Sequence, residues 1–433
     1  MFVAFAALSA HAQTEVGLPV LPIDLTTALR LAGEQSPRVA AAEATARAAS
    51  GELLSTYERF LPSVSAGWQL QRHEGRTQAT QGEFLDVDKQ SQRVGGLIAA
   101  RWDFSSALFS TLSAHQRRNA AESDLKDKSL STMLDVARAY WDLVQSSEYH
   151  RIAGRAAKVS EDLVEQSRRS VEQGIAAELD LLRDRTQLRH DLLLLDQAVE
   201  REAAASARLA SLLNMDQPIR LTPIDTVLLV IETVDSTESL QSWLDRADQS
   251  HPGIAMQIAE LAASRWEARR AIWGPLLPDF EAGALVTGFG PDLNDLRRSR
   301  DYSVAVRWTI GPGGLFDLGR IRSLSARADF ANTRLEGVRA DIMSKATMWH
   351  EAISVRGRSV STAAGGLDDA RKALEVAITR RTTGVGMALE VIDAAEALAR
   401  AEREHAQAVV SYNLAQMEVL ALLGDIGSAT TSR

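Results

Sequence analysis

Few residue sets in this sequence could carry catalysis. Glu402 and His405 form its single Glu-x-x-His pattern, whereas a di-iron helical bundle needs two such patterns and further carboxylates. The chain has no cysteine, which excludes disulfides, thiolate metal sites and thiol catalysis. The His-Glu-x-x-His motif of zinc proteases and the Gly-x-x-x-x-Gly-Lys motif of phosphate-binding loops are also missing from it. We therefore expect neither an enzyme nor a bound cofactor or metal.

Two acidic residues indicate a role in handling ions instead. Glu390 and Asp393 follow a break at Gly384–Gly386, and their spacing of three residues puts them on one helix face. Acidic residues in a first helical turn are stabilised by the helix dipole. In a single chain this stabilisation alone explains both residues, without any role in function. If several copies met about an axis, the crowded carboxylates would raise some pKa values and attract cations.

Composition narrows the class of protein. The chain has 433 residues with 48 basic and 57 acidic side chains, a net charge of −9, whereas a nucleic-acid binder normally shows a basic face. Its 27 glycines and 11 prolines are about 9% of the residues, below the ~12% of average proteins. Long helices are therefore expected. The longest internal apolar run, 227–231, is far shorter than the ~18 residues of a membrane-spanning helix. Strands of a membrane β-barrel alternate apolar and polar residues, so the length of apolar runs does not detect them.

The N-terminus has the features of an export signal. An apolar stretch, Met1–Leu8, is followed by Ala10-x-Ala12, the pattern of a signal peptide and its cleavage site. We predict a signal peptide over residues 1–12 and an exported protein. Because the basic residues that normally begin such peptides are absent, we expect the natural start of the precursor to lie upstream.

An internal repeat organises the rest of the chain. A repeat with a long period indicates that one structural unit occurs more than once in the fold. Four blocks recur in the same order at offsets of about 210 residues, so each half forms one structural unit. The matching blocks are 29–39 with 244–254, 57–67 with 273–283, 108–109 with 315–316, and 174–214 with 384–424.

Proline and heptad patterns predict the elements of each half. No proline occurs between Pro62 and Pro218 or after Pro312, and Leu181 and Leu188 begin a seven-residue spacing typical of supercoiled helices. The first repeat is predicted over 13–237, with helix 26–59, strands 63–72 and 93–104, long helix 112–170, helix 178–213 and a connecting, equatorial segment 214–237. The second is predicted over 238–424, with helix 239–273, strands 280–288 and 302–310, long helix 318–380 and helix 389–423, followed by a tail, 425–433.

The four strands alternate apolar and polar residues. Each has about 9 to 12 residues, the length of a tilted strand that crosses a membrane, with aromatic residues near the ends. A four-stranded soluble sheet with one buried face is the alternative, although it leaves two open edges. In lipid the edges must close, so several copies would have to associate: two copies provide eight strands and three provide twelve.

Several motifs together resemble the TolC-type family of outer-membrane efflux and secretion channels. The most specific is GLFDLGRIR, Gly314–Arg322, which leads from the second strand pair into the long helix. The turns at 173–175 and 384–386, with the acidic residues that follow them, are also similar to the family. The resemblance extends over residues 24–424.

The resemblance implies a fold, an assembly and partners. The fold class is mainly α with a membrane β-barrel part: long coiled-coil helices form a trimeric α-barrel, and four strands per chain contribute to a 12-stranded transmembrane β-barrel. The homotrimer would lie in the cell outer membrane, in contact with its lipid, with a periplasmic extension. It would bind a periplasmic adaptor (membrane fusion protein) and, directly or indirectly, an inner-membrane transporter, but no nucleic acid. As the exit duct of a tripartite efflux or type I secretion system, it would conduct substrates passively. The alternative is a soluble periplasmic coiled-coil adaptor or scaffold protein.

The family also implies two functional regions. At the position of the family's basic latch this chain has Gly386, with Arg380 and Arg381 nearby. The residues that match a pore constriction are Glu390, Asp393 and Asp180. Those that match the adaptor-docking tips are Gly174, Ile175, Gly384 and Val385.

Overall fold

The computed structural model describes residues 19–174, 177–215, 217–224, 229–235, 238–311, 316–383 and 385–426. The predicted signal peptide therefore lies outside the described residues. The chain forms two compact units, each of which takes residues from both sequence repeats. Unit 1 comprises Met1–Ala40, Lys128–Ala247 and Met343–Arg433, and unit 2 comprises Ala41–Asp127 and Asp248–Ile342. The predicted boundary at 237/238 thus falls inside unit 1.

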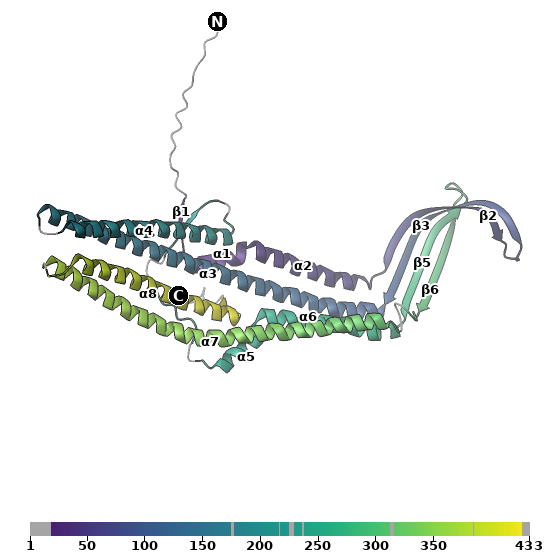
Figure 1. The fold of residues 1–433 in the computed structure, drawn as a ribbon. Helices are drawn as coiled ribbons and strands as arrows, with labels where there is room; N and C mark the ends of the chain where they lie inside the picture. Colours follow the sequence, from purple (N-terminus) through teal and green to yellow (C-terminus); the bar gives the residue numbers. More distant parts are fainter. Residues whose placement is uncertain are drawn as a thin grey trace, which may run out of the picture. The chain divides into compact units, whose positions relative to one another are not determined.

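The order helix, helix, strand, strand, long helix, helix occurs twice along the chain (Figure 1), and the prediction of a mainly helical fold is confirmed. The first set is α1 (Leu25–Gln35), α2 (Pro37–Glu58), β2 (Ser63–Gln78), β3 (Phe84–Asp103), α3 (Phe104–Glu172) and α4 (Glu178–Leu212). The second set is α5 (Leu240–Ser250), α6 (Pro252–Trp273), β5 (Asp279–Gly290), β6 (Arg297–Arg307), α7 (Leu318–Thr382) and α8 (Ala388–Leu422), with a short 3-10 turn, Gly274–Leu276, after α6.

The single helices predicted over 26–59 and 239–273 are wrong, because each is divided by a proline. The residue before a proline is pushed out of the helical region, and Ser36 and His251 are extended, with ψ of 126° and 119°. Pro37 and Pro252 then start new helices, a position where the missing N–H is not needed. The His251 Nδ1 atom accepts a hydrogen bond from the Gly253 N–H at 3.0 Å, which caps α6.

The two long helices are continuous. The structure has α3 and α7 where the sequence predicts helices over 112–170 and 318–380, and neither is broken within its bounds. An interior glycine costs a helix about 1 kcal/mol, but Gly357 lets α7 pack closely on α8: a Cβ atom there would lie 3.4 Å from the Tyr412 ring. None of the helices in the described part of the chain combines the length and apolar character that crossing a membrane requires.

Unit 2 carries a four-stranded antiparallel sheet in the order β2-β3-β5-β6 (Figure 1). Its first hairpin is longer than predicted: the predicted strands end at residue 72 and begin again at residue 93, but β2 and β3 pair out to Gln78 opposite Phe84. The polar side chains sustain pairing here because they bond across the strands, as Arg72 does to Asp88 at 3.0 Å. The strand predicted over 302–310 likewise starts earlier, at Arg297, and ends at Arg307.

One face of this sheet is apolar across all the strands. In the register, Val64 lies opposite Ile98, Ile98 opposite Ala284, and Ala284 opposite Tyr302, so the alternating apolar residues of every strand share a face. Val64, Tyr302 and Val304 are 74%, 75% and 82% exposed. The apolar face is therefore largely uncovered within the described chain, and the outer edges of β2 and β6 are unpaired.

Unit 1 is built around a core between its helices and a small parallel sheet. Strand β1 (Val20–Ile23) pairs with β4 (Arg220–Pro223), although almost 200 residues separate them along the chain. Their buried side chains Ile23 and Leu221 pack with Tyr140 of α3 and Leu209 of α4. This sheet is not predicted from the sequence, since each strand has only four residues and shows no measurable alternation.

Candidate functional site

The α3–α4 turn is one of two helix turns in unit 1 that carry the predicted tip residues. Gly174 has a φ of +72°, a conformation that only glycine adopts without strain, and its N–H donates to the Val171 carbonyl at 2.9 Å. Apart from its chain neighbours, no atom of the described residues lies within 4 Å of the place where its Cβ would be. Ile175 lies outside the described residues. Leu179 and Leu182, which follow the turn, are more than half exposed.

The α7–α8 turn is tighter. The N–H groups of Val385 and Gly386 both donate to the Arg380 carbonyl, at 3.0 and 2.8 Å. A Cβ atom at position 386 would lie 2.9 Å from the Arg381 nitrogen, so this position needs glycine for lack of space. Gly384 lies outside the described residues. Val385 is 70% exposed and Met387 65%, so this turn also presents apolar side chains.

The predicted constriction residues sit in different environments. Glu390 accepts a hydrogen bond from Arg380 Nε at 3.1 Å. Asp180 lies 3.8 Å from Arg183 on its own helix. Asp393 is exposed. No hydrogen bond or ion pair within the described residues joins Asp180 to either acidic residue of α8, so a single chain does not gather the three into one site.

A buried polar contact near the turns was not predicted from the sequence. The Arg381 Nη2 atom of α7 donates to Asp184 Oδ2 of α4 at 3.2 Å and to Ser167 Oγ of α3 at 2.7 Å, and the Ser167 hydroxyl also bonds to Asp184. The Asp184 side chain is 0% exposed and that of Arg381 12%. This contact, the Arg381–Asp184–Ser167 link, joins the α3–α4 hairpin to α7 just before both turns.

A repeating spacing in the sequence could have indicated this link. Ser160 bonds to Asp191 in the same way as Ser167 bonds to Asp184, and both pairs are buried. The two serines on α3 and the two aspartates on α4 are each seven residues apart. Seven residues is the repeat of supercoiled helices, so polar side chains at this spacing recur on the face where the two helices meet.

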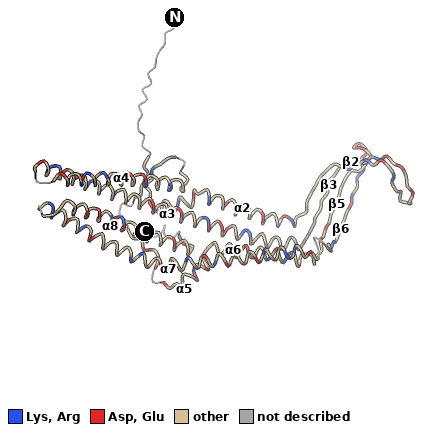
Figure 2. The backbone as a smooth tube through the Cα atoms, in the orientation of Figure 1, with Lys and Arg blue, Asp and Glu red and all other residues tan. Residues whose placement is uncertain are grey.

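Neighbouring charges and burial lower the pKa of one side chain on α3 and of another on α8. The exposed Glu165 carboxylate of α3 accepts hydrogen bonds from Arg168 and Arg169, which lower its pKa to about 2. On α8, burial lowers the pKa of His405, and the positive charge of Arg371 lowers it further, against the opposing effect of Glu148. Acidic and basic residues are interspersed along α3, α4, α7 and α8 (Figure 2), so no helix presents a uniformly basic surface.

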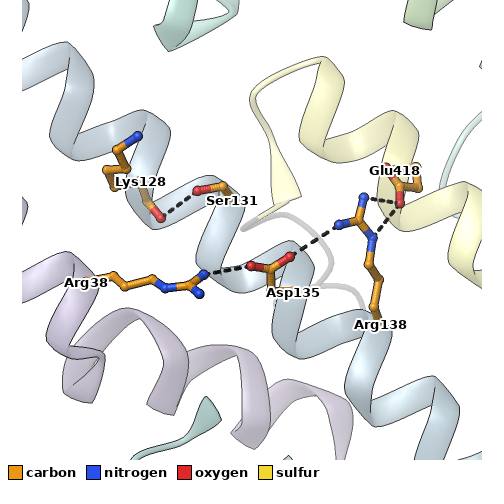
Figure 3. Close-up of polar contacts among 6 residues, drawn as sticks. All are labelled: Arg38, Lys128, Ser131, Asp135, Arg138 and Glu418. Carbon is orange, nitrogen blue, oxygen red and sulfur yellow. Dashed lines mark hydrogen bonds and ion pairs between the residues drawn. The ribbon is translucent and has the colours of Figure 1, made fainter.

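A second charged network holds the other end of unit 1 together (Figure 3). Asp135 of α3 accepts from Arg38 of α2 at 2.9 Å and from Arg138 at 3.2 Å. Arg138 also donates to Glu418 of α8 at 2.6 and 2.8 Å. Exposed ion pairs contribute little singly, but the Glu418 side chain is only 11% exposed. The network therefore fixes α2 and α8 against the same stretch of α3.

Comparisons with known proteins agree with this architecture. Among solved structures the chain is similar to the outer-membrane channel OprN, with 20% identity, a TM-score of 0.79 and coverage of 92% of this chain and 89% of that one. It is also similar to the outer membrane protein VceC of Vibrio cholerae, with 16% identity, a TM-score of 0.77 and coverage of 93% and 96%. The open MtrE outer membrane channel of Neisseria gonorrhoeae is also similar, with 17% identity, a TM-score of 0.78 and coverage of 93% of this chain and 89% of that one. These likenesses show the fold.

Part of the sequence also matches a family model. No curated protein sequence matches the chain significantly. Residues 28–215, however, match the family model described as outer membrane efflux protein. That match covers nearly all of the first series of helices and strands, and the fold likeness extends over more than nine-tenths of the chain. The resemblance inferred from the motifs is therefore confirmed: residues 28–215 match the sequence pattern of outer membrane efflux proteins, and the chain has the fold of outer-membrane channels.

Proposed function

We propose that this chain is one protomer of a trimeric outer-membrane channel that serves as the passive exit duct of a tripartite efflux or type I secretion system. The match of residues 28–215 to the outer membrane efflux protein model supports transport and agrees with the expectation that the chain is not an enzyme. The observation that carries the proposal is the sheet of unit 2, which within the described residues has a largely uncovered apolar face and two unpaired edges.

The sheet indicates that several copies associate. An open sheet edge is not tolerated within lipid, because its N–H and C=O groups have no water to bond. Four strands are too few to close, and eight leave an interior just wide enough for side chains. Three copies would provide twelve strands, closing β6 of each copy on β2 of the next, and would leave room for a duct.

The opposite face of the sheet suits the wall of such a duct. Ser63, Ser65, Glu281, Ser303 and Arg307 alternate with the apolar residues and therefore point to the other side of the sheet. Hydroxyl groups and charges interspersed with apolar residues such as Leu97 and Leu285 are compatible with water and with varied cargo. We therefore assign the choice of cargo to the transporter.

At the helix turns we propose adaptor docking and a constriction. Gly174, Ile175, Gly384 and Val385 would be the docking tips, since the described turns are narrow and present exposed apolar side chains. Glu390, Asp393 and Asp180 would form rings of carboxylates when three copies meet about an axis. Arg380 already neutralises Glu390, so Asp393 would contribute most of the negative charge.

Fractionation and conductance measurements test the proposal. We expect the full-length protein to stay with outer membranes during carbonate washing, to require detergent for extraction, and to have the mass of three chains. In planar bilayers it should open stable, ion-conducting pores. The rival, a soluble periplasmic adaptor or scaffold, would wash off with carbonate and give no conductance, and that result would overturn the proposal.

A further inference from the structure

Two arginines on β6 have no acidic partner among the described residues. Arg298 and Arg300 are exposed and are two residues apart on the strand, so both side chains leave the same face of the sheet, about 6.6 Å apart. Within the described part of the chain, no hydrogen bond or ion pair involves either guanidinium. Their neighbour Arg297, on the opposite face, lies 4.0 Å from Asp295.

The surroundings of these arginines are uncharged. Arg298 lies opposite Gly288 and Arg300 opposite Val286 on β5, and these in turn lie opposite Val94 and Gly96 on β3. On this face, β5 has only apolar residues and glycine between Phe280 and Gly290. The two positive charges therefore stand at one end of an apolar surface, and no carboxylate of β5 or β6 shares that face with them.

The outward residues of β6 change in polarity along the strand. From Arg298 and Arg300 they continue with Tyr302, Val304 and Val306, of which Tyr302 is 75% and Val304 82% exposed. Charge, then an amphipathic aromatic ring, then aliphatic side chains is the order of polarity from the headgroups of a bilayer to its hydrocarbon. The arginines thus stand where headgroups would be if the valines contacted lipid chains.

We infer that Arg298 and Arg300 bind the phosphate groups of anionic lipid headgroups at the rim of the sheet. A guanidinium presents two parallel N–H groups that match two phosphate oxygens, and two such groups on one face can hold one phosphate or two adjacent ones. This inference rests on the proposed function, because it requires the apolar face to contact lipid. Each copy in the assembly would contribute one such site.

Lipid binding to the detergent-solubilised assembly tests the inference. Native mass spectrometry would measure the binding of phosphatidylglycerol and of phosphatidylcholine to the wild type and to Arg298→Gln/Arg300→Gln. A basic residue near an anionic lipid surface contributes about fivefold in affinity. We expect the wild type to prefer phosphatidylglycerol and the double variant to lose about five- to 25-fold of that preference. The control variant Arg297→Gln removes one positive charge from the opposite face of the sheet. This variant should keep the wild-type preference for phosphatidylglycerol.

Several results would overturn the inference. One is an unchanged preference for phosphatidylglycerol in the double variant, and another is an equal loss in Arg297→Gln. Full competition by inorganic phosphate would show a site for the free anion rather than for lipid. Dissociation of the double variant into single chains, with lipid preference intact, would show that the arginines pair with acidic residues of the adjacent copy. Failure of the proposed function would appear separately, as a wild type that gives no conductance.

Discussion

At the residue scale, the Arg381–Asp184–Ser167 link is the contact whose loss should matter most. Removing one partner of a buried ion pair costs about 3 to 5 kcal/mol, because the other charge stays buried without compensation. We expect Asp184→Ala to lower the free energy of unfolding by about that amount, measured by denaturant titration in detergent. The double variant Asp184→Leu/Arg381→Leu leaves no buried charge and should recover most of the loss. Equal destabilisation by both variants would contradict the assignment.

The acidic residues of α8 allow a prediction about ions. Because Arg380 bonds to Glu390 while Asp393 is exposed, Asp393→Ala should weaken the block of single-channel current by divalent cations more than Glu390→Ala does. Arg380→Ala, which frees the Glu390 carboxylate, should strengthen the block. The dependence of current on cation concentration measures all three. If Asp393→Ala left conductance and block unchanged, the constriction would lie elsewhere.

His405 gives a prediction about pH. In the folded chain, burial and the charge of Arg371 lower the pKa of His405. In the unfolded chain the imidazole has its ordinary pKa of about 6.5, so below that pH the unfolded chain binds a proton there more readily than the folded chain does. The neutral imidazole therefore favours the folded state above that pH, and this contribution is lost as the pH falls through the lowered pKa. We expect wild-type stability to fall more than that of His405→Gln between pH 7 and pH 5, measured by thermal denaturation. Parallel curves would contradict the prediction.

At the scale of an element, the turn between α3 and α4 separates backbone from surface effects. Gly174 has a positive φ and open space around it, so Gly174→Val strains only the backbone, at about 1 to 2 kcal/mol, whereas asparagine adopts this conformation more readily. We expect Gly174→Val to destabilise the chain more than Gly174→Asn.

Efflux assays on the same two variants test the role of the turn in docking. If close approach of an adaptor requires a small residue at position 174, both variants should reduce efflux while the amount of trimer in the membrane stays the same. A loss of trimer that parallels the loss of efflux would instead assign Gly174 a purely structural role.

At the scale of the whole molecule, the two faces of the sheet should respond differently to charge. Val304 is on the apolar face and its neighbour Ser303 on the polar one. An arginine that faces lipid at the bilayer midplane costs about 2 to 4 kcal/mol, so Val304→Arg should reduce the membrane-inserted trimer, while the matched Ser303→Arg should not. Heat-modifiable mobility on gels measures both. Equal insertion of the two variants would argue against a lipid-facing sheet.

Much of the fold could be predicted because its causes are local. Heptad spacing and the lack of proline indicate the long helices, and alternation indicates strands whose apolar residues prove to share one face. Local rules also account for the helix breaks at Pro37 and Pro252, which the proline positions could have predicted. The ends of β2 and β3 could not be located in this way, because their polar residues are stabilised by cross-strand bonds such as Arg72 to Asp88.

By itself the sequence determined the duplicated order of elements, the positions of Glu390, Asp393 and the turn glycines, and the resemblance to a family of efflux channels. Tertiary structure alone decided which charges are compensated. Asp184 and Arg381 are about 200 residues apart in the sequence yet share a buried bond, and Arg380 neutralises Glu390 across a turn. The periodic pattern of apolar residues indicates which face of a helix or strand is buried. Whether a charged side chain is buried and paired depends on which other elements pack against that helix or strand.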